Sequence, residues 1–445
     1  RQVLVARQFG LSHELDAFNV ANNVPDLLFA LISGGALAIA FIPVLSEVLT
    51  SSGRRPAWTL FSHIANLAFL VTTGLSLLVA VFAPTLVKAQ MGIAPGFTLS
   101  QQNLVIYLMR LNLIATVIFS ISGLVMAGLQ ANQHFLFPAL APIFYNIGQI
   151  FGVLILVPEH GYSIGPIVLP AMNMGITGLV YGVILGAVLH LLIQVPALIH
   201  YQFHWSTGLG LQTSEVKQVL RLMAPRVVTI FLIQLVFLIR DNLASRLALG
   251  SVTTLTYAWM LQQVPETLIG TAIGTALLPT LSELAASEKL EEFHQTIQKA
   301  VKVLLALCLP IAAILAVGVR PLLSVVFGFG KEGTQLLVLA TAAFLGGLLG
   351  HSLNEVGARA FYARQNALIP MMTAGINVVL YILLGSLLFR PMGVGGIALT
   401  DSIVFTFEAL LLLWLQGRKL QHAFRAGSTL WRALLAAAVG GFITW

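Results

Sequence analysis

The chain has 445 residues, of which 58% are hydrophobic and only 9% are charged. A soluble domain carries about 25% charged residues, so a water-soluble fold of this length is excluded and most of the surface must face lipid. The net charge of +7 is spread over short loops rather than gathered on one face. This distribution argues against nucleic acid as a partner.

Apolar runs that are long enough to cross a bilayer, about 20 residues each, recur along the whole chain. They predict an all-α polytopic membrane protein with about 13–14 transmembrane helices. Transmembrane β-strands alternate in hydrophobicity, so these continuous runs exclude a β-barrel. The predicted segments are 1–10, 18–49, 58–88, 103–130, 135–157, 172–201, 218–248, 253–285, 296–327, 334–360, 366–389, 394–416 and 428–445.

Both ends of the chain look cut. It begins at Arg1 without a methionine and stops inside an apolar run at Trp445. We therefore expect the natural protein to be longer, with incomplete first and last segments here. The single cysteine, Cys308, excludes a disulfide within the chain and is expected to be a small buried apolar residue.

Positive residues gather after the even-numbered segments. Loops rich in Lys and Arg stay in the cytoplasm, so the even-numbered loops and the N-terminus are expected there. The cations of the even-numbered loops are Arg54, Arg55, Lys217, Arg221, Arg226, Lys289, Lys299, Lys302, Arg359, Arg364, Arg418, Lys419 and Arg425. The odd-numbered loops carry only Lys88, Arg320, Lys331 and Arg390.

The chain contains an internal repeat. The stretch Val24–Glu47 and the stretch Val264–Glu283 both open with Val-Pro-acid and close with Pro-x-Leu-Ser-Glu, and "LQANQHFLFP" is echoed by "FYARQNALIP". Six helices per copy give both copies the same orientation, as in parallel repeats about the membrane normal. We expect an N-terminal lobe at 1–203, a C-terminal lobe at 214–416 and the start of additional C-terminal helices at 426–445.

Small residues and prolines recur at matching places in the two copies. Ser33–Ala36 and Gly270–Ala276 allow close helix approach, and Pro25, Pro43, Pro265 and Pro279 break or kink helices. Ordinary packing of membrane helices is the alternative for any one of them. The recurrence favours a bent helix in each copy, lining the space between the lobes.

Ionisable side chains at membrane depth are costly and usually face a cavity or a partner. Several guanidinium groups in one cavity suit a phosphate or pyrophosphate, because the planar fork binds such oxygens bidentately. Asp26 and Glu266 follow Pro25 and Pro265 at equivalent points and are expected to act as counter-ions. The predicted substrate-binding residues are Arg1, Arg7, Arg110, Arg240, Asp26 and Glu266.

The second lobe carries a candidate cation site. Two carboxylates, Asp241 and Asp401, together with the amide oxygen of Asn377, could hold a monovalent cation such as Na+. The alternative is that Asp241 pairs with Arg240 or Arg246. No P-loop, zinc-protease or nucleophile-elbow motif is present, so the sequence predicts a transporter rather than an enzyme, and no cofactor beyond Na+.

Several motifs resemble the MviN/MurJ family over the whole chain: "ARQFG", "DAF", "ALLPTLSE" and "RAFYARQNALIP". The resemblance implies the multidrug/oligosaccharidyl-lipid/polysaccharide flippase superfamily, with two six-helix lobes and two additional helices. It also implies translocation of lipid II, the undecaprenyl-pyrophosphate-linked peptidoglycan precursor. Arg1 and Arg7 match arginines of the family's first helix, and Asp241 and Asn377 match its proposed sodium ligands.

The chain departs from the family at three cationic positions. The family's paired arginines in the second segment are replaced by Phe29 and Ala30, and the arginine of its Tyr-Ala-Asp-Arg-Leu motif is replaced by Met260. The acid before that arginine is replaced by Trp259. A cavity without these three cations is expected to bind pyrophosphate less tightly or through other contacts.

These observations lead to one expectation and two alternatives. We expect a monomeric flippase of a bacterial inner membrane that moves lipid II to the outer leaflet by alternating access. One alternative is an exporter of another lipid-linked saccharide or of small cations on the same two-lobed plan. The other is a scaffold of the cell envelope that transports nothing.

Overall fold

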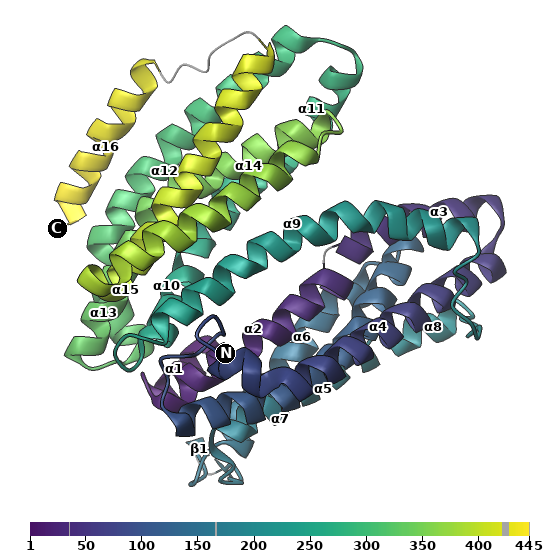
Figure 1. The fold of residues 1–445 in the computed structure, drawn as a ribbon, viewed down its shortest axis with the longest axis horizontal. Coiled ribbons are helices and arrows are strands. Elements are labelled where there is room, and N and C mark those ends of the chain that lie inside the picture. Colours follow the sequence, from purple (N-terminus) through teal and green to yellow (C-terminus); the bar gives the residue numbers. More distant parts are fainter. Residues whose placement is uncertain (35, 165–166, 421–426, 445) are drawn as a thin grey trace. The chain divides into compact units, whose positions relative to one another are not determined.

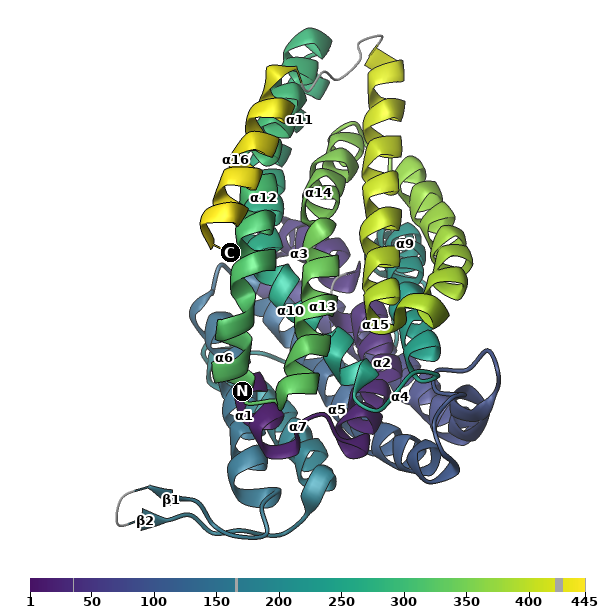
Figure 2. The same cartoon turned by 90° about the vertical axis from the view of Figure 1, so that its left-hand side faces the viewer.

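The computed structural model describes residues 1–34, 36–164, 167–420 and 427–444, and it leaves aside the side chains of residues 33–39, 163–167 and 419–420. The described chain is helical apart from one antiparallel pair of two-residue strands, β1 (Ser163–Ile164) and β2 (Ile167–Val168), which projects from one end of its unit (Figure 2). The all-α class expected from the sequence is confirmed. The side chains of Ser33–Ala36 and parts of the expected segment 426–445 lie outside the described residues.

The chain divides into two compact units, and the division falls inside helix α9 (Ser214–Ala244). Unit 1 comprises residues 1–9 and 13–234, and unit 2 comprises residues 10–12 and 235–445. The lobe boundaries expected from the repeat, at 203 and 214, stay a prediction.

Unit 1 is a helical bundle built around one long helix, α5. Its partners α2, α4 and α7 pack along α5, and α6 packs against α7 (Figure 1). The elements of unit 1 are α1 (Gln2–Phe9), α2 (His13–Phe29), η1 (Ala30–Gly34), α3 (Ala36–Ser51), α4 (Arg54–Lys88), α5 (Leu99–Ala131), α6 (Leu136–Phe151), η2 (Gly152–Leu156), α7 (Gly175–Leu192) and α8 (Val195–His200).

An aromatic cluster anchors the core of unit 1. Trp58 and Phe61 are fully buried and meet the ring of Phe203 edge to face. The Trp58 indole Nε1 donates a hydrogen bond of 3.0 Å to the carbonyl of Tyr201. This bond satisfies the one polar atom of a buried Trp side chain and fixes the chain that follows α8 against α4.

Unit 2 is a second helical bundle. Its helix α14 packs against α15, and the C-terminal helix α16 lies along α12 (Figures 1 and 2). The elements of unit 2 after α9 are α10 (Ser251–Glu266), η3 (Thr267–Thr271), α11 (Ala272–Ala286), α12 (Leu290–Phe327), α13 (Lys331–Gly346), α14 (Leu348–Ala363), α15 (Leu368–Leu420) and α16 (Ser428–Thr444).

Nine of the described helices are long and apolar enough to cross a membrane, and their bounds follow most of the expected segments. One of them, Leu368–Arg418, contains two helices joined at Gly393, whose φ of 56° breaks the helical geometry. The helices also reach beyond the apolar runs. Several cations that the sequence assigns to loops, among them Arg54, Lys217 and Arg359, lie inside α4, α9 and α14.

The internal repeat is visible in matching backbone conformations. Gly10 and Gly250, aligned in the repeat, both have positive φ, at 60° and 81°. Gln133 and Gln365, also aligned, have φ of 57° and 55°. After each glutamine a backbone N–H returns to a carbonyl five residues earlier, from His134 to Leu129 and from Asn366 to Phe361. Both helices therefore end in the same left-handed cap.

Each copy carries an irregular helical segment at the place where the repeat predicts a bend. In the first copy, the π-helical segment η1 separates α2 from α3, and in the second copy η3 separates α10 from α11. Each segment follows the proline of a Val-Pro-acid motif, Pro25 or Pro265. A π-turn and a proline both interrupt the regular hydrogen bonds of an α-helix, so these segments are natural bending points.

Candidate substrate and ion sites

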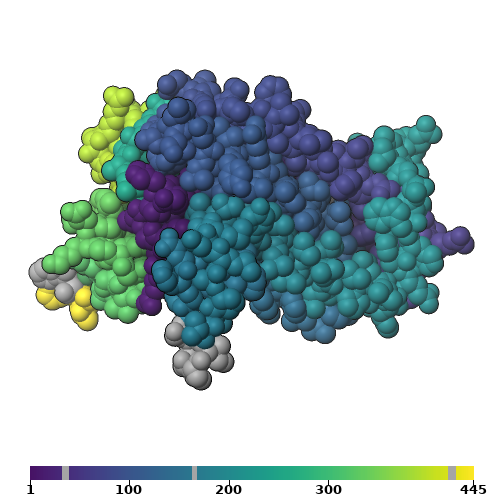
Figure 3. Space-filling view, turned by 90° about the horizontal axis from the view of Figure 1, so that it is seen from below, coloured from purple at the N-terminus to yellow at the C-terminus, as the bar shows by residue number. Residues whose placement is uncertain are grey.

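In unit 1, Arg1 contacts helix α6 and lies within electrostatic reach of helix α2. Its Nη1 lies 3.5 Å from the Oδ1 of Asn146, and its guanidinium stands 5.9 Å from the centre of the Tyr145 ring. Its charge also reaches Asp26 on α2. The helix α1 that follows Arg1 is purple in Figure 3 and lies at the surface, and both Arg1 and Asp26 are exposed. Arg1 and Asp26 are thus within electrostatic reach of each other, and the exposed guanidinium remains able to meet an anion. The role of Asp26 as a counter-ion stays a prediction.

Arg110 has a structural partner. Its Nε donates a hydrogen bond of 2.9 Å to the carbonyl oxygen of Ala80 on α4. That carbonyl is four residues before Pro84, which has no N–H to complete the helical hydrogen bond. Arg110 therefore replaces the missing backbone donor, and this bond connects it to α4 rather than to Arg1 or Asp26. Arg7 is exposed at the end of α1.

Aromatic packing occupies the place of one family arginine. Phe29 meets the ring of Phe119 at 5.5 Å, and Phe119 in turn meets Tyr145 at 5.0 Å and His190 at 5.4 Å. Ala30 is half-buried beside it. Phe29 thus contacts Phe119, which in turn contacts Tyr145, the ring beside the Arg1 guanidinium. An aromatic contact stands here where the family has a cation.

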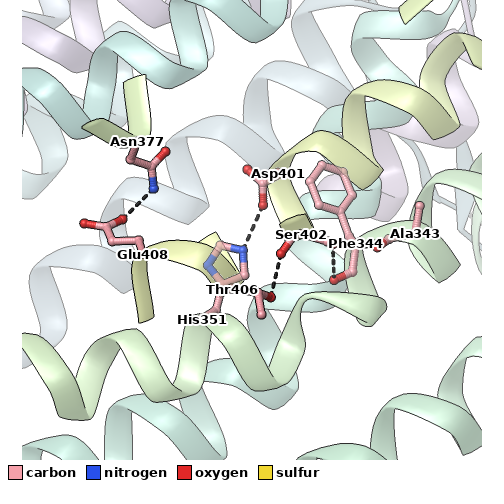
Figure 4. Close-up of polar contacts among 8 residues, drawn as sticks. All are labelled: Ala343, Phe344, His351, Asn377, Asp401, Ser402, Thr406 and Glu408. Atoms are coloured by element: carbon pink, nitrogen blue, oxygen red, sulfur yellow. Dashed lines mark hydrogen bonds and ion pairs between the residues drawn. The ribbon is translucent and has the colours of Figure 1, made fainter. Parts of the chain in front are cut away.

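In unit 2, the predicted charges are buried in pairs. Arg240 and Asp241 are 6% and 1% exposed and form an ion pair of 3.2 Å between Nε and Oδ1. Oδ2 of Asp401 on α15 lies 2.8 Å from Nε2 of His351 on α14 (Figure 4). The pairing of Asp241 with Arg240 is the alternative that the sequence left open, and Arg240 is buried rather than presented to solvent.

Asn377 faces the second half of α15 across the turn at Gly393. Its Nδ2 donates to Oε2 of Glu408 at 2.5 Å (Figure 4). The hydroxyl of Thr373 donates to the other oxygen of Glu408 at 3.1 Å. The Oδ1 atom of Asn377 is buried and has no hydrogen-bond partner, and the same holds for the hydroxyl of Tyr381. Tyr381 is fully buried and within electrostatic reach of Asp401, Arg240 and Asp241.

These contacts bear on a cation site. A buried oxygen without a donor, such as Asn377 Oδ1, fits a hard cation, which oxygen ligands prefer to hold. Asp241 is paired with Arg240, and Asp401 is in contact with His351. Within the described residues, no group of three or more His, Cys, Asp and Glu side chains could hold a metal ion by itself. A monovalent cation held by Asp241, Asn377 and Asp401 stays a prediction.

Glu266 and the positions around Met260 belong to α10. Glu266 accepts a hydrogen bond of 3.0 Å from the hydroxyl of Thr271, which spans the π-turn η3. Met260 is half-buried. Trp259, at the position of the family's acid, meets the rings of Phe344 and His351. Here too aromatic packing stands where the family has a charge.

The site residues predicted from the sequence did not include four side chains that the structure brings into these clusters: Tyr145, Asn146, His351 and Glu408. His351 and Glu408 carried a signal, since both are ionisable and lie at membrane depth. Tyr145 and Asn146 carried none, because an aromatic and an amide in an apolar helix are ordinary there.

Comparison with known proteins places the chain in a family. A family model described as lipid II flippase MurJ matches residues 5–445. The lipid II flippase MurJ of Burkholderia cenocepacia is 30% identical over 422 residues, which cover 93% of this chain and 79% of that protein. The probable lipid II flippase MurJ of Bdellovibrio bacteriovorus is 27% identical and covers 90% and 75%.

Solved structures agree on the fold. A lipid II flippase MurJ in an inward closed conformation matches with a TM-score of 0.78 at 21% identity, covering 100% of this chain and 94% of that chain. An inward-facing transporter of the MATE family matches with a TM-score of 0.77 at 14% identity, covering 95% of both. At these identities the likeness shows the two-lobed fold alone. With the match of the family model along nearly its whole length, the chain belongs to the lipid II flippase MurJ family of multi-pass transporters of the bacterial inner membrane.

Proposed function

We propose that this protein moves lipid II, a polyprenyl-pyrophosphate-linked precursor of peptidoglycan, from the inner to the outer leaflet by alternating access. The observation that carries the proposal is the family match over residues 5–445. The fold by itself does not select this substrate, because a MATE transporter shares it at a similar TM-score. Membership of the family favours the lipid-linked substrate over small cations and over a scaffold.

Arg1 is the side chain that we assign to the pyrophosphate. It is exposed. Among the described residues it meets the ring of Tyr145 and the amide oxygen of Asn146, and it lies within electrostatic reach of Asp26. An arriving diphosphate offers stronger charge-assisted hydrogen bonds than the amide does, so it can displace Asn146. Arg7, which is also exposed, is the second cation that we assign to this role. Arg110 donates to the Ala80 carbonyl and Arg240 pairs with Asp241.

The test is transport of labelled lipid II in proteoliposomes, with complementation of cells depleted of their own flippase. Arg1→Ala is expected to lower the rate by about tenfold or more, in line with the loss of a charge-assisted contact. Arg390→Ala is the matched control, because Arg390 is also exposed and stands 5.7 Å from the Phe389 ring. Equal rates for the two variants would remove Arg1 from the headgroup site.

A monovalent cation bound by Asp241, Asn377 and Asp401 is a second part of the proposal. The unpartnered Oδ1 of Asn377 supports it. Moving one charge through the membrane potential supplies about 2.3 kcal/mol per 100 mV, so such an ion could reset the cycle. Na+ is expected to raise the melting temperature of the wild type relative to choline. Asn377→Leu should abolish this shift, and Thr373→Val, which removes the other contact to Glu408, should keep it; a shift that survives in Asn377→Leu would refute the site.

The topology and assembly state complete the proposal. We propose that the N-terminus and the even-numbered loops are cytoplasmic and that the protein acts as a monomer. The excess of Lys and Arg after the even-numbered segments supports the orientation. Cysteines placed at exposed positions such as Ser52 and Met91 should be labelled from opposite sides of the membrane by an impermeant maleimide. Labelling from the same side would contradict the orientation.

A further inference from the structure

The bent helix of unit 2 is in close contact with α14. A Cβ atom on Gly270 would lie 2.7 Å from the Cα of Ser352, so the two backbones nearly touch at this point. One turn later, a Cβ on Gly274 would lie 2.0 Å from Nη1 of Arg359. Two glycines four residues apart allow helices in a membrane to approach closely. Here the second glycine makes room for the guanidinium of Arg359.

Arg359 uses this space to reach the backbone of the bend. Its Nη1 donates a hydrogen bond of 3.2 Å to the carbonyl oxygen of Thr271, the last residue of η3. The same carbonyl accepts a hydrogen bond of 2.7 Å from the hydroxyl of Thr275. Side chains that hydrogen-bond to a helix carbonyl draw it off the regular helical direction and bend the helix.

A carboxylate on α14 holds Arg359 in place. Glu355, one turn earlier, forms an ion pair of 2.8 Å with Arg359 Nη1. Glu266, at the end of α10, accepts a hydrogen bond of 3.0 Å from the Thr271 hydroxyl and lies within electrostatic reach of Glu355. Two like charges within reach repel each other. Arg359 therefore both bonds to the backbone of η3 and places a positive charge beside Glu355.

From these contacts we infer that Arg359, seated on Gly274 and oriented by Glu355, is a positioning residue that sets the angle between α10 and α11. The inference rests on the proposed transport function, because a transporter that works by alternating access needs helices with discrete arrangements. An exposed ion pair one turn apart contributes little alone. The bond to a backbone carbonyl at a π-turn is what links this pair to the shape of the helix.

The bend is measured by spin labels at Gln263 and Glu283, two exposed positions on either side of η3, in a Cys308→Ser background. A straight helix would separate these Cα atoms by about 30 Å, which is within the range of pulsed electron paramagnetic resonance. Arg359→Gln is expected to shift or broaden the distance distribution. Gly274→Ala should have the same effect, because its methyl group occupies the space of Nη1.

Transport kinetics provide a second readout. Arg359→Gln is expected to lower the maximal flipping rate by about three- to tenfold, as for one lost charge-assisted hydrogen bond, with little change in the half-saturating lipid concentration. Arg359→Lys should restore part of the rate, since an ammonium group can also donate to Thr271 and pair with Glu355. Lys289→Gln, which removes a surface ion pair with Glu292, is the control and should match the wild type in both readouts.

Folding is checked on the native cysteine. Cys308 is fully buried and lies 3.5 Å from Ser352 Oγ, so slow reaction with a maleimide shows that the helices around the bend are intact. If Arg359→Gln keeps the wild-type distance distribution, the inference is wrong, whatever its transport rate. If the wild type moves no lipid II but the distances change as expected, the proposed function fails and the role of Arg359 in the bend remains.

Discussion

Glycines between α6 and α7 support a quantitative prediction. One side of this contact carries Gly148 of α6 and Gly152, the first residue of η2. The other side carries Gly178, Gly182 and Gly186 of α7. A Cβ added to Gly148 would lie 2.4 Å from the Cα of Gly186, and one added to Gly152 would lie 2.8 Å from the Cα of Gly182. Because the obstructing atoms are backbone, no side-chain rotation can relieve the overlap. The variant Gly148→Ala must therefore separate the two helices.

The size of the effect follows from these distances. Ordinary contact begins at 3.4 Å, so the separation needed at Gly148 is 3.4 − 2.4 = 1.0 Å. Overpacking of this kind costs about 1–3 kcal/mol, whereas alanine gains about 1 kcal/mol over glycine in helix propensity. We expect a net destabilisation of up to about 2 kcal/mol. Tyr145, which stands under Arg1, lies one turn earlier on α6, so the headgroup site should move as well.

The assay is unfolding of the purified protein in detergent, followed by circular dichroism as temperature or SDS increases. Gly74→Ala is the control, because a Cβ at Gly74, inside α4, meets nothing within 4 Å. It should be neutral or stabilising by up to about 1 kcal/mol. If Gly148→Ala unfolds at the same midpoint as Gly74→Ala, the close approach of α6 and α7 does not exist as described.

Two further predictions concern single hydrogen bonds. Arg110→Leu leaves the Ala80 carbonyl without its donor and should lower the free energy of unfolding by about 1–3 kcal/mol. In a Pro84→Ala background, where a backbone N–H is restored, this loss should be smaller. An unchanged loss in the double-mutant cycle would contradict the role of Arg110. Trp58→Phe removes the donor to the Tyr201 carbonyl while keeping the aromatic cluster, and should lower stability by about 1–3 kcal/mol in the same unfolding assay, without changing the half-saturating lipid concentration.

The sequence determined the local features of this protein. Its apolar runs predicted helices, because a chain in lipid must satisfy its backbone hydrogen bonds within each segment. The repeat predicted equivalent structure, and the left-handed residues Gln133 and Gln365 share one helix cap since the same short motif surrounds them. The irregular segments η1 and η3 lie where the repeated prolines predicted bends, because a proline removes a backbone hydrogen bond of the helix that contains it.

The partners of the charges at membrane depth were decided by the tertiary structure. The sequence shows that a charge at membrane depth needs a partner, but that partner depends on how helices pack and in which register. Arg110 binds a carbonyl on another helix, Asp401 meets His351 fifty residues away in the chain, and Arg359 reaches the bend across a glycine. A guanidinium spans several ångströms and donates to carbonyls and carboxylates, and it also stacks on rings, so only the packed structure selects among these partners.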